Sequence, residues 1–252
     1  MSYFTMGYWI IGLSVAVSMV GALIGFACIR QSTMSATAQF RAVWQVSAAI
    51  SIGGIGAWLP VFVSMLGVTV PGSLIRYDVT RVAGAALAAV LAVWAALVLL
   101  GRTAAVPRLI LAGVVMGGGL GLMHYLALDA VRIQGSTSLD PLLIGGAVAI
   151  AVVVCLATLW FVGSPRSMPA LTGAALLFAA GVAAMHYTDL AGLQANPSSG
   201  RSVPAGEDLF GFFVPVFVIG MLSLAIPISA ILVAPDRRPM VQPRPVGTNS
   251  AF

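Results

Sequence analysis

Long apolar stretches separated by short polar segments are the main pattern along the chain. Seven of them are recognised, at roughly residues 7–29, 42–66, 82–100, 109–128, 141–162, 168–188 and 209–234. In a bilayer every backbone N–H and C=O must be satisfied within its own segment, so apolar runs of about twenty residues predict spanning helices. The pattern therefore predicts an all-α membrane protein, a bundle of seven transmembrane helices.

The transmembrane domain predicted from this pattern covers residues 1–234. The remaining residues 235–252 include four prolines and lack an apolar run, which predicts a short disordered tail. Composition supports this organisation, because 60% of the residues are hydrophobic and 8% are charged. A soluble domain of this size does not need so much apolar material to fill one core. The lipid bilayer is therefore the expected surrounding of the chain.

Arginines distinguish the two ends of the predicted helices. One set of ends carries eight of them: Arg30, Arg41, Arg102, Arg108, Arg166, Arg237, Arg238 and Arg244. The opposite ends carry four: Arg76, Arg81, Arg132 and Arg201. The positive-inside rule then predicts a multi-pass protein of the cell membrane with its N-terminus outside and its C-terminus in the cytoplasm. The net charge of +5 comes from arginines at helix ends, so we expect no nucleic acid partner.

The two histidines of the chain occur in the same tripeptide. Met-His-Tyr is found at residues 123–125 and again at 185–187, sixty-two positions later. Such flanking of both histidines by chance is improbable, so the recurrence indicates an internal repeat. A similar step backwards reaches the end of the second apolar stretch, where residues 60–62 read Pro-Val-Phe. The chain is therefore predicted to consist of three repeated helix pairs plus one helix.

The repeat brings candidate metal ligands to one depth. Helices two, four and six should run in the same direction, so their repeated sites meet near the outer membrane surface, and the small residues before each histidine permit close packing. Imidazole suits several transition metals and thioether suits Cu(I), which makes copper the expected ion. The candidate ligands are His124, His186, Met123, Met185 and Met65. Neighbouring helical residues diverge by about 100°, so Met123 and His124 are not expected to face the bundle centre together.

Several other interpretations remain open for these residues. Each histidine could bond a carbonyl or an interfacial water, and the methionines could serve packing alone. Two histidines at one depth could also be the axial ligands of a haem in an electron carrier. Asp129 and Asp189 follow the two motifs and are expected to be solvated. Transport and catalysis have less support, because the expected spans contain no paired carboxylates and no nucleophile motif.

Other polar and special residues within the spans have ordinary structural interpretations. Ser14, Ser18 and Ser223 are expected to bond a carbonyl one turn earlier in their own helices. Pro60, Pro215 and Pro227 lie inside spans, where a missing backbone N–H creates a possible hinge. The buried cysteines Cys28 and Cys155 are expected to remain unpaired and to pack as small apolar groups. The five tyrosines cluster at the predicted outer ends, where rings can anchor at the headgroups.

The whole pattern resembles the bacterial MHYT sensor domain, over about residues 7–234. Residues 185–188 give the full Met-His-Tyr-Thr signature, and residues 123–125 keep its first three positions. The resemblance implies a non-enzymatic membrane sensor that binds copper through histidines and methionines and responds to a diatomic gas or a redox signal. The implied ligand role carries over to Met123, His124, Met185 and His186. Pro60 and Val61 occupy the corresponding positions of the first repeat and depart from the family's Met-His pattern. Since many members continue into signalling enzymes, we expect this standalone chain to act through a separate signalling protein.

Overall fold

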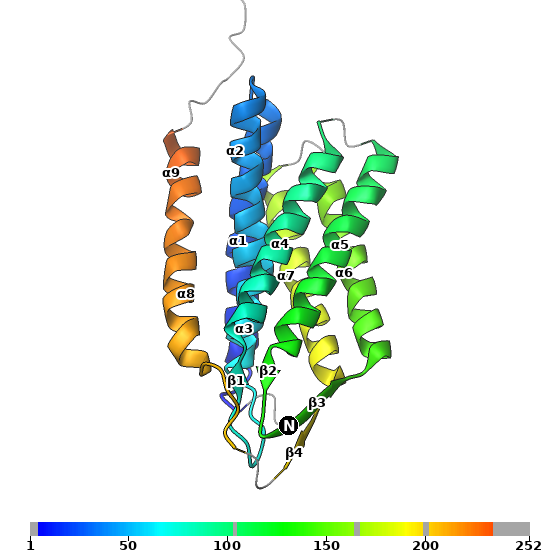
Figure 1. Ribbon diagram of the computed structural model, residues 1–252. Helices are drawn as coiled ribbons and strands as arrows, with labels where there is room; N and C mark the ends of the chain where they lie inside the picture. Colours follow the sequence, from blue (N-terminus) through cyan, green and yellow to red (C-terminus); the bar gives the residue numbers. More distant parts are fainter. Residues whose placement is uncertain (1–4, 103–104, 164–166, 199–201, 234–252) are drawn as a thin grey trace, which may run out of the picture.

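The computed structural model describes residues 5–102, 105–163, 167–198 and 202–233, and within them seven helices are long and apolar enough to cross a membrane (Figure 1). The prediction of a seven-helix bundle is confirmed. The spans are α1 (Trp9–Met34), α2 (Ala38–Ala49) continued by η1 (Ile50–Trp58) and α3 (Leu59–Met65), α4 (Val79–Leu100), α5 (Val106–Asp129), α6 (Pro141–Val162), α7 (Met168–Gly192), and α8 (Leu209–Ser223) continued by α9 (Ala225–Val233). The predicted tail, 235–252, lies outside the described residues.

The second span contains a π-helix, η1, between two α-helical segments. Its wider turn is seen where the N–H of Leu59 donates to the carbonyl of Gly54, five residues earlier. Pro60 follows directly and has no N–H, so the carbonyl of Gly56 lacks the donor it would have in an α-helix. The hydroxyl of Ser18 donates to this carbonyl instead. The irregular backbone is therefore bonded from the first span.

The serine bonds differ from the sequence-based expectation in two of three cases. Ser223 donates to Gly220 in its own helix, in line with the prediction. Ser18 bonds Gly56, and Ser14 donates to the carbonyl of Pro60, 3.1 Å away on the neighbouring span. The prediction was wrong for these two serines, because α1 packs against the second span and both hydroxyls reach carbonyls of that span.

Glycines determine how closely the central helices approach. On α5, Gly113, Gly117 and Gly121 recur every fourth residue. A methyl group added to any of them would overlap α6, whose Leu156, Val152 and Val148 lie opposite in the same order. This is the small-residue packing expected inside a bilayer, where association depends on van der Waals contact. The fourth and fifth spans are thus held in close contact below the first Met-His-Tyr motif.

Short strands tie the loops together at one end of the bundle (Figure 1). Strand β1 (Arg76–Tyr77) pairs antiparallel with β2 (Val131–Arg132), and β3 (Gly135–Leu139) pairs antiparallel with β4 (Leu193–Pro197). The paired segments follow the second, fourth and sixth spans. These pairings join the three connections of the repeated helix pairs into one covering layer, the strand cap, at the predicted outer end.

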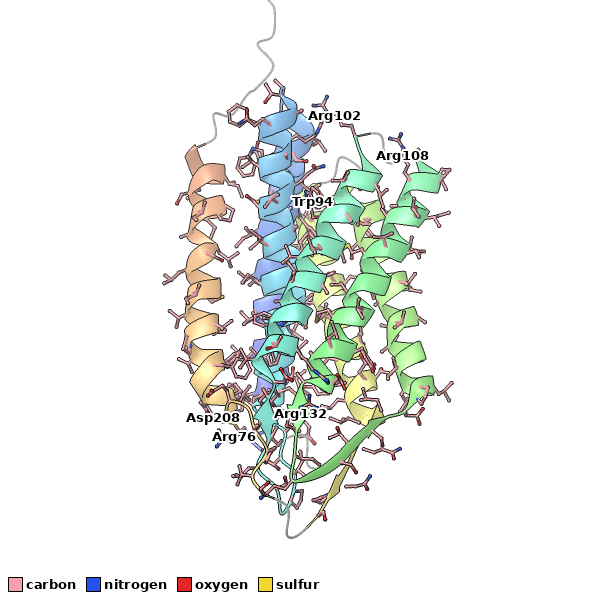
Figure 2. The ribbon with its side chains drawn as sticks, in the orientation of Figure 1. Arg76, Trp94, Arg102, Arg108, Arg132 and Asp208 are labelled. Carbon is pink, nitrogen blue, oxygen red and sulfur yellow. The ribbon has the colours of Figure 1, made fainter. Side chains whose placement is uncertain are left out.

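Ion pairs reinforce the strand cap. Arg81 contacts both Asp129 and Asp78, and Arg132 lies 3.2 Å from Asp78. Arg76 and Asp208 form a further pair at 3.6 Å (Figure 2). The N–H of Arg81 donates to the Asp78 carboxylate; this bond and the arginines Arg132 and Arg81 hold the pKa of Asp78 below its usual value. Each arginine described at this end therefore faces a carboxylate.

An aromatic cluster fixes the seventh span against the strand cap. The ring of Tyr77 lies 6.1 Å from that of Phe62 and 5.5 Å from that of Phe212 on α8. Tyr77 is fully buried, so it is a core residue and not the headgroup anchor expected from its position in the sequence. The rest of the seventh span packs more loosely, with Pro215 inside α8 and a break at Leu224 between α8 and α9.

Candidate metal centre at the histidine pair

The two histidines face each other inside the bundle. His124 lies on α5 and His186 on α7, with ring centroids 5.8 Å apart and ring planes inclined by 57°. Both side chains are enclosed, with exposed fractions of 0% and 2%. They lie one to two turns before the ends of their helices, close to the strand cap. The predicted approach of the two imidazoles near this end of the bundle is confirmed.

The ring nitrogens of this pair make no hydrogen bond of standard geometry. Neither nitrogen of His124 and neither nitrogen of His186 has a partner among the described residues. The Leu120 carbonyl, one turn before His124, approaches its ring without meeting that geometry. Buried polar atoms normally have a hydrogen-bond partner, and an exception needs an explanation such as an ion or water. For His186 a bond to a carbonyl has no support among the described residues, whereas for His124 the Leu120 carbonyl is the nearby candidate.

The three candidate methionines are all buried, with exposed fractions of 2% or less for Met65, Met123 and Met185. Burial of both Met123 and His124 does not require them to face one bundle centre. Helix α5 packs against α4 and against α6, so neighbouring residues that diverge by about 100° can both be buried against different helices. Inward-facing positions on α5 are therefore not restricted to one stripe.

The first repeat contributes differently from the other two. Val61 occupies the position that corresponds to the histidines and is buried, but its side chain has no donor atom. Ser64 of the same repeat lies near the hydroxyl of Tyr187, the tyrosine that follows His186. The Ser64 hydroxyl donates to Ser14 on α1, 3.0 Å away. The first repeat is thus bonded to the first span and lies beside the third repeat.

Asp189 is a residue that the sequence-based interpretation placed incorrectly. It was expected to be solvated at the outer boundary, yet it is 2% exposed and its Oδ1 has no partner among the described residues. It follows His186 by three positions, so both share a face of α7. This three-residue spacing was the feature of the sequence that could have placed Asp189 on the buried face of His186. Among the described residues no three His, Cys, Asp or Glu side chains gather closely enough to hold a metal ion, so Asp189 does not join both imidazoles in one ligand set.

Asp129 and the cysteines have structural roles. Asp129 is partly exposed at the end of α5 and pairs with Arg81 in the strand cap. Cys28 and Cys155 are free and buried, as predicted. Neither residue type adds a ligand to the histidine pair.

Comparison with known proteins supports the repeat. Residues 54–113 and 117–175 match the MHYT family model, described as a bacterial signalling protein N-terminal repeat. His124 falls in the second matched segment, and His186 lies beyond it. No solved structure matches the chain.

Two relatives from Pseudomonas aeruginosa are similar over most of the chain. The bifunctional diguanylate cyclase/cyclic di-GMP phosphodiesterase MucR is 32% identical over 206 residues, covering 77% of this chain and 29% of the relative. The cyclic di-GMP phosphodiesterase NbdA is 31% identical over 184 residues, covering 66% of this chain and 21% of the relative. The chain therefore spans less than a third of either protein. With two matched repeats and a seven-helix bundle, the chain is a multi-pass membrane protein that belongs to the MHYT family of bacterial signalling proteins.

Proposed function

We propose that the chain is a non-enzymatic sensor of the cell membrane, and that the His124–His186 pair is its sensing site and binds copper. The observation that carries the proposal is the pair itself: two enclosed imidazoles 5.8 Å apart whose four nitrogens have no partner among the described residues. Unpaired polar atoms at this depth are costly unless a ligand satisfies them.

The spacing of the rings is compatible with one shared ion. A bond from a metal to an imidazole nitrogen is about 2.0 Å long, which places the centroids of two rings on one ion roughly 5–6 Å apart. The observed separation falls within that range. The ring pair therefore needs little rearrangement to act as two ligands.

The donor types favour copper over ions that prefer oxygen. His124 and His186 would hold the ion, and thioethers from Met123, Met185 or Met65 would complete the set. Magnesium and calcium prefer carboxylate and carbonyl oxygens. Copper, when bound, would supply a centre able to change oxidation state or to accept a diatomic gas. The protein side chains would shield it, because each candidate ligand is buried.

A haem between the same histidines is the second candidate, and the packing disfavours it. The ring spacing does not by itself separate a haem from a single ion, but a porphyrin would need room between the rings for its whole macrocycle. Both rings are enclosed by surrounding side chains. A single ion fits this space more readily than a macrocycle.

A path for the signal runs from the third repeat to the π-helix. Tyr187 follows His186, and its hydroxyl lies near Ser64. Ser64 donates to Ser14, and Ser14 donates to the Pro60 carbonyl. A shift of the imidazoles on ligand binding would alter this series of bonds. The π-helix η1 adjoins it, and π segments are often found at functional sites. We propose that η1 and Pro60 convert the change at the histidines into a change of helix packing.

The output would pass to a separate signalling protein at the cytoplasmic end. Because the two relatives are named for cyclic di-GMP enzymes, an enzyme of this class is the first partner to test. Co-purification with such an enzyme, and its activity with and without copper, would examine this step.

Elemental analysis and an optical spectrum of the purified chain test the metal proposal. We expect stoichiometric copper without a Soret band, loss of copper in His124→Ala and in His186→Ala, and a smaller loss in Met65→Leu. Cys155→Ala is the matched control, since it removes a buried thiol outside the site and should keep full copper. Thermal unfolding would establish that the histidine variants remain folded. Full copper in the double histidine variant would refute the assignment, and a Soret band would select haem.

Hydrogen exchange tests the signal path separately. Copper should change the exchange of residues 50–58 in the native chain. Tyr187→Phe should keep copper and lose that change, because it removes the hydroxyl that lies near Ser64. An unchanged response in this variant would contradict the path while leaving the copper site in place.

A further inference from the structure

A second cavity lies beside the strand cap, away from the histidine pair. It is a cleft of about 570 Å³ between the last turn of α5, strand β3 and the first turn of α6. Its lining residues are Tyr125, Leu128, Asp129, Thr137, Ser138, Leu139, Pro141, Ile144 and Gly145. This volume falls within the range of ligand sites in proteins, and nothing in the proposed copper site uses it.

The cleft has a polar part and an apolar part. Tyr125, Thr137 and Ser138 present hydroxyl groups, and Asp129 presents a carboxylate, around the strand and the end of α5. Gly145, on the first turns of α6, lies on the apolar side toward the membrane interior. The polar part is thus at the level of the helix ends, where lipid headgroups lie, and the apolar part extends toward the hydrocarbon.

Gly145 shows that the cleft opens to the bilayer. It is exposed, and a methyl group added to it would meet no atom within 4 Å. It belongs to a membrane-spanning helix, so its open side faces lipid. Further along the same face of α6 the cleft is closed, because Val148 and Val152 pack against the glycines of α5. An occupant can therefore enter from the membrane.

The charged residue in the described lining of the cleft is an acid, one of whose carboxylate oxygens already contacts Arg81. The described lining contains one carboxylate, Asp129, and no arginine. Arg81 of α4 pairs with Asp129 but does not line the cleft. The ring of Tyr125 is 41% exposed and lies one turn before Asp129 on the same helix. A carboxylate beside an exposed aromatic ring is a suitable environment for an ammonium group.

We propose that this cleft binds a phospholipid with a primary ammonium headgroup, of the phosphatidylethanolamine class. The ammonium would lie between Asp129 and Tyr125, and the phosphate oxygens would accept hydrogen bonds from Thr137 and Ser138. The first part of an acyl chain would pass over Gly145. This site is independent of the proposed copper site, and its occupancy does not require a metal.

Lipid titration of the purified full-length chain, followed by native mass spectrometry, tests the proposal. Phosphatidylethanolamine and phosphatidylglycerol with identical acyl chains would be compared. We expect about tenfold tighter binding of the first lipid, a difference of about 1.4 kcal/mol. Equal binding of both lipids would overturn the proposed role of the carboxylate and ring.

Two variants locate the site. Gly145→Leu should fill the cleft and abolish the preference, while Gly173→Leu, at another open position on α7, should retain it. Tyr125→Leu should reduce the preference. A preference unchanged in Gly145→Leu would refute this location. Competition by soluble phosphoethanolamine at the same concentration as the lipid would show that the cleft takes a water-soluble amine, and the lipid proposal would be wrong.

Discussion

Ser18 of the first span donates its hydroxyl to the carbonyl oxygen of Gly56 in the second span. In a regular α-helix the N–H of residue 60 would bond that carbonyl, and Pro60 has none to offer. A side chain from a neighbouring helix therefore donates to a backbone carbonyl that lacks its α-helical donor inside the membrane.

Removal of this hydroxyl should destabilise the chain. Ser18→Ala is expected to lower the free energy of unfolding by about 1 kcal/mol, in the upper part of the range for interhelical bonds in membranes. Thermal unfolding in one detergent would show this as a decrease of roughly 2–4 °C. Ser223→Ala is the control, because its hydroxyl bonds within its own helix, and it should change the midpoint little. Equal effects of the two variants would contradict the interpretation.

Two glycines of α1 should respond differently to the same substitution. An alanine methyl group at Gly21 would lie 2.5 Å from the backbone nitrogen of Gly56, whereas one at Gly12 would meet no atom within 4 Å. Gly21→Ala is therefore expected to cost about 1–3 kcal/mol through overpacking. Gly12→Ala should be neutral or stabilising by up to about 1 kcal/mol, because alanine favours helix. Unfolding midpoints of the two variants make the comparison directly.

The charge distribution predicts the orientation. Among the described residues, Arg30 and Arg102 bond a methionine sulfur and a serine carbonyl, with no carboxylate described at their end of the bundle. Arg76, Arg81 and Arg132 at the opposite end all pair with carboxylates, and Figure 2 labels Arg76 and Arg132 at that end. The end with unpaired positive charge should be cytoplasmic. A reporter active only in the cytoplasm, fused after Phe252, should function, and activity of an exported reporter there instead would reverse the orientation.

Asp78 should make stability depend on pH in acid. Its folded pKa is lowered, first by the N–H of Arg81 and then by Arg132 and Arg81. A carboxyl with a lowered folded pKa adds stability above its unfolded pKa and loses it as pH falls through the folded value. The unfolding midpoint of the native chain should therefore exceed that of Asp78→Asn above about pH 5, and the difference should shrink below about pH 4. A difference that grows toward acid pH would contradict this assignment.

The spans and the histidine pair could be predicted from the sequence. Hydropathy determines the helices because the bilayer requires long apolar segments, and the repeated tripeptide implied that His124 and His186 would meet. The π-helix could not be predicted, because residues 50–58 have an ordinary apolar composition and the change of backbone bonding depends on Ser18 and Pro60 together.

The strand cap and Asp189 were not predictable for related reasons. Strands of two residues have no alternation to recognise, and the pairing of Arg76 with Arg132 joins segments far apart in the chain. Asp189 follows a motif at the end of a span, where acids are usually solvated. Its burial depends on the packing of α7 against α1 and α6, which the local sequence does not specify.

The strand cap also determines where movement can be large. Its strand pairings hold the loops of three repeats together at one end of the bundle. The spans can therefore tilt about this fixed end, which lies next to the histidines. A tilt of about 5° around the fixed end displaces the far end of a span by about 3 Å across a bilayer core of about 30 Å. A small rearrangement beside the fixed end is thus amplified at the arginine-bearing end, on the side where a signalling partner would receive it.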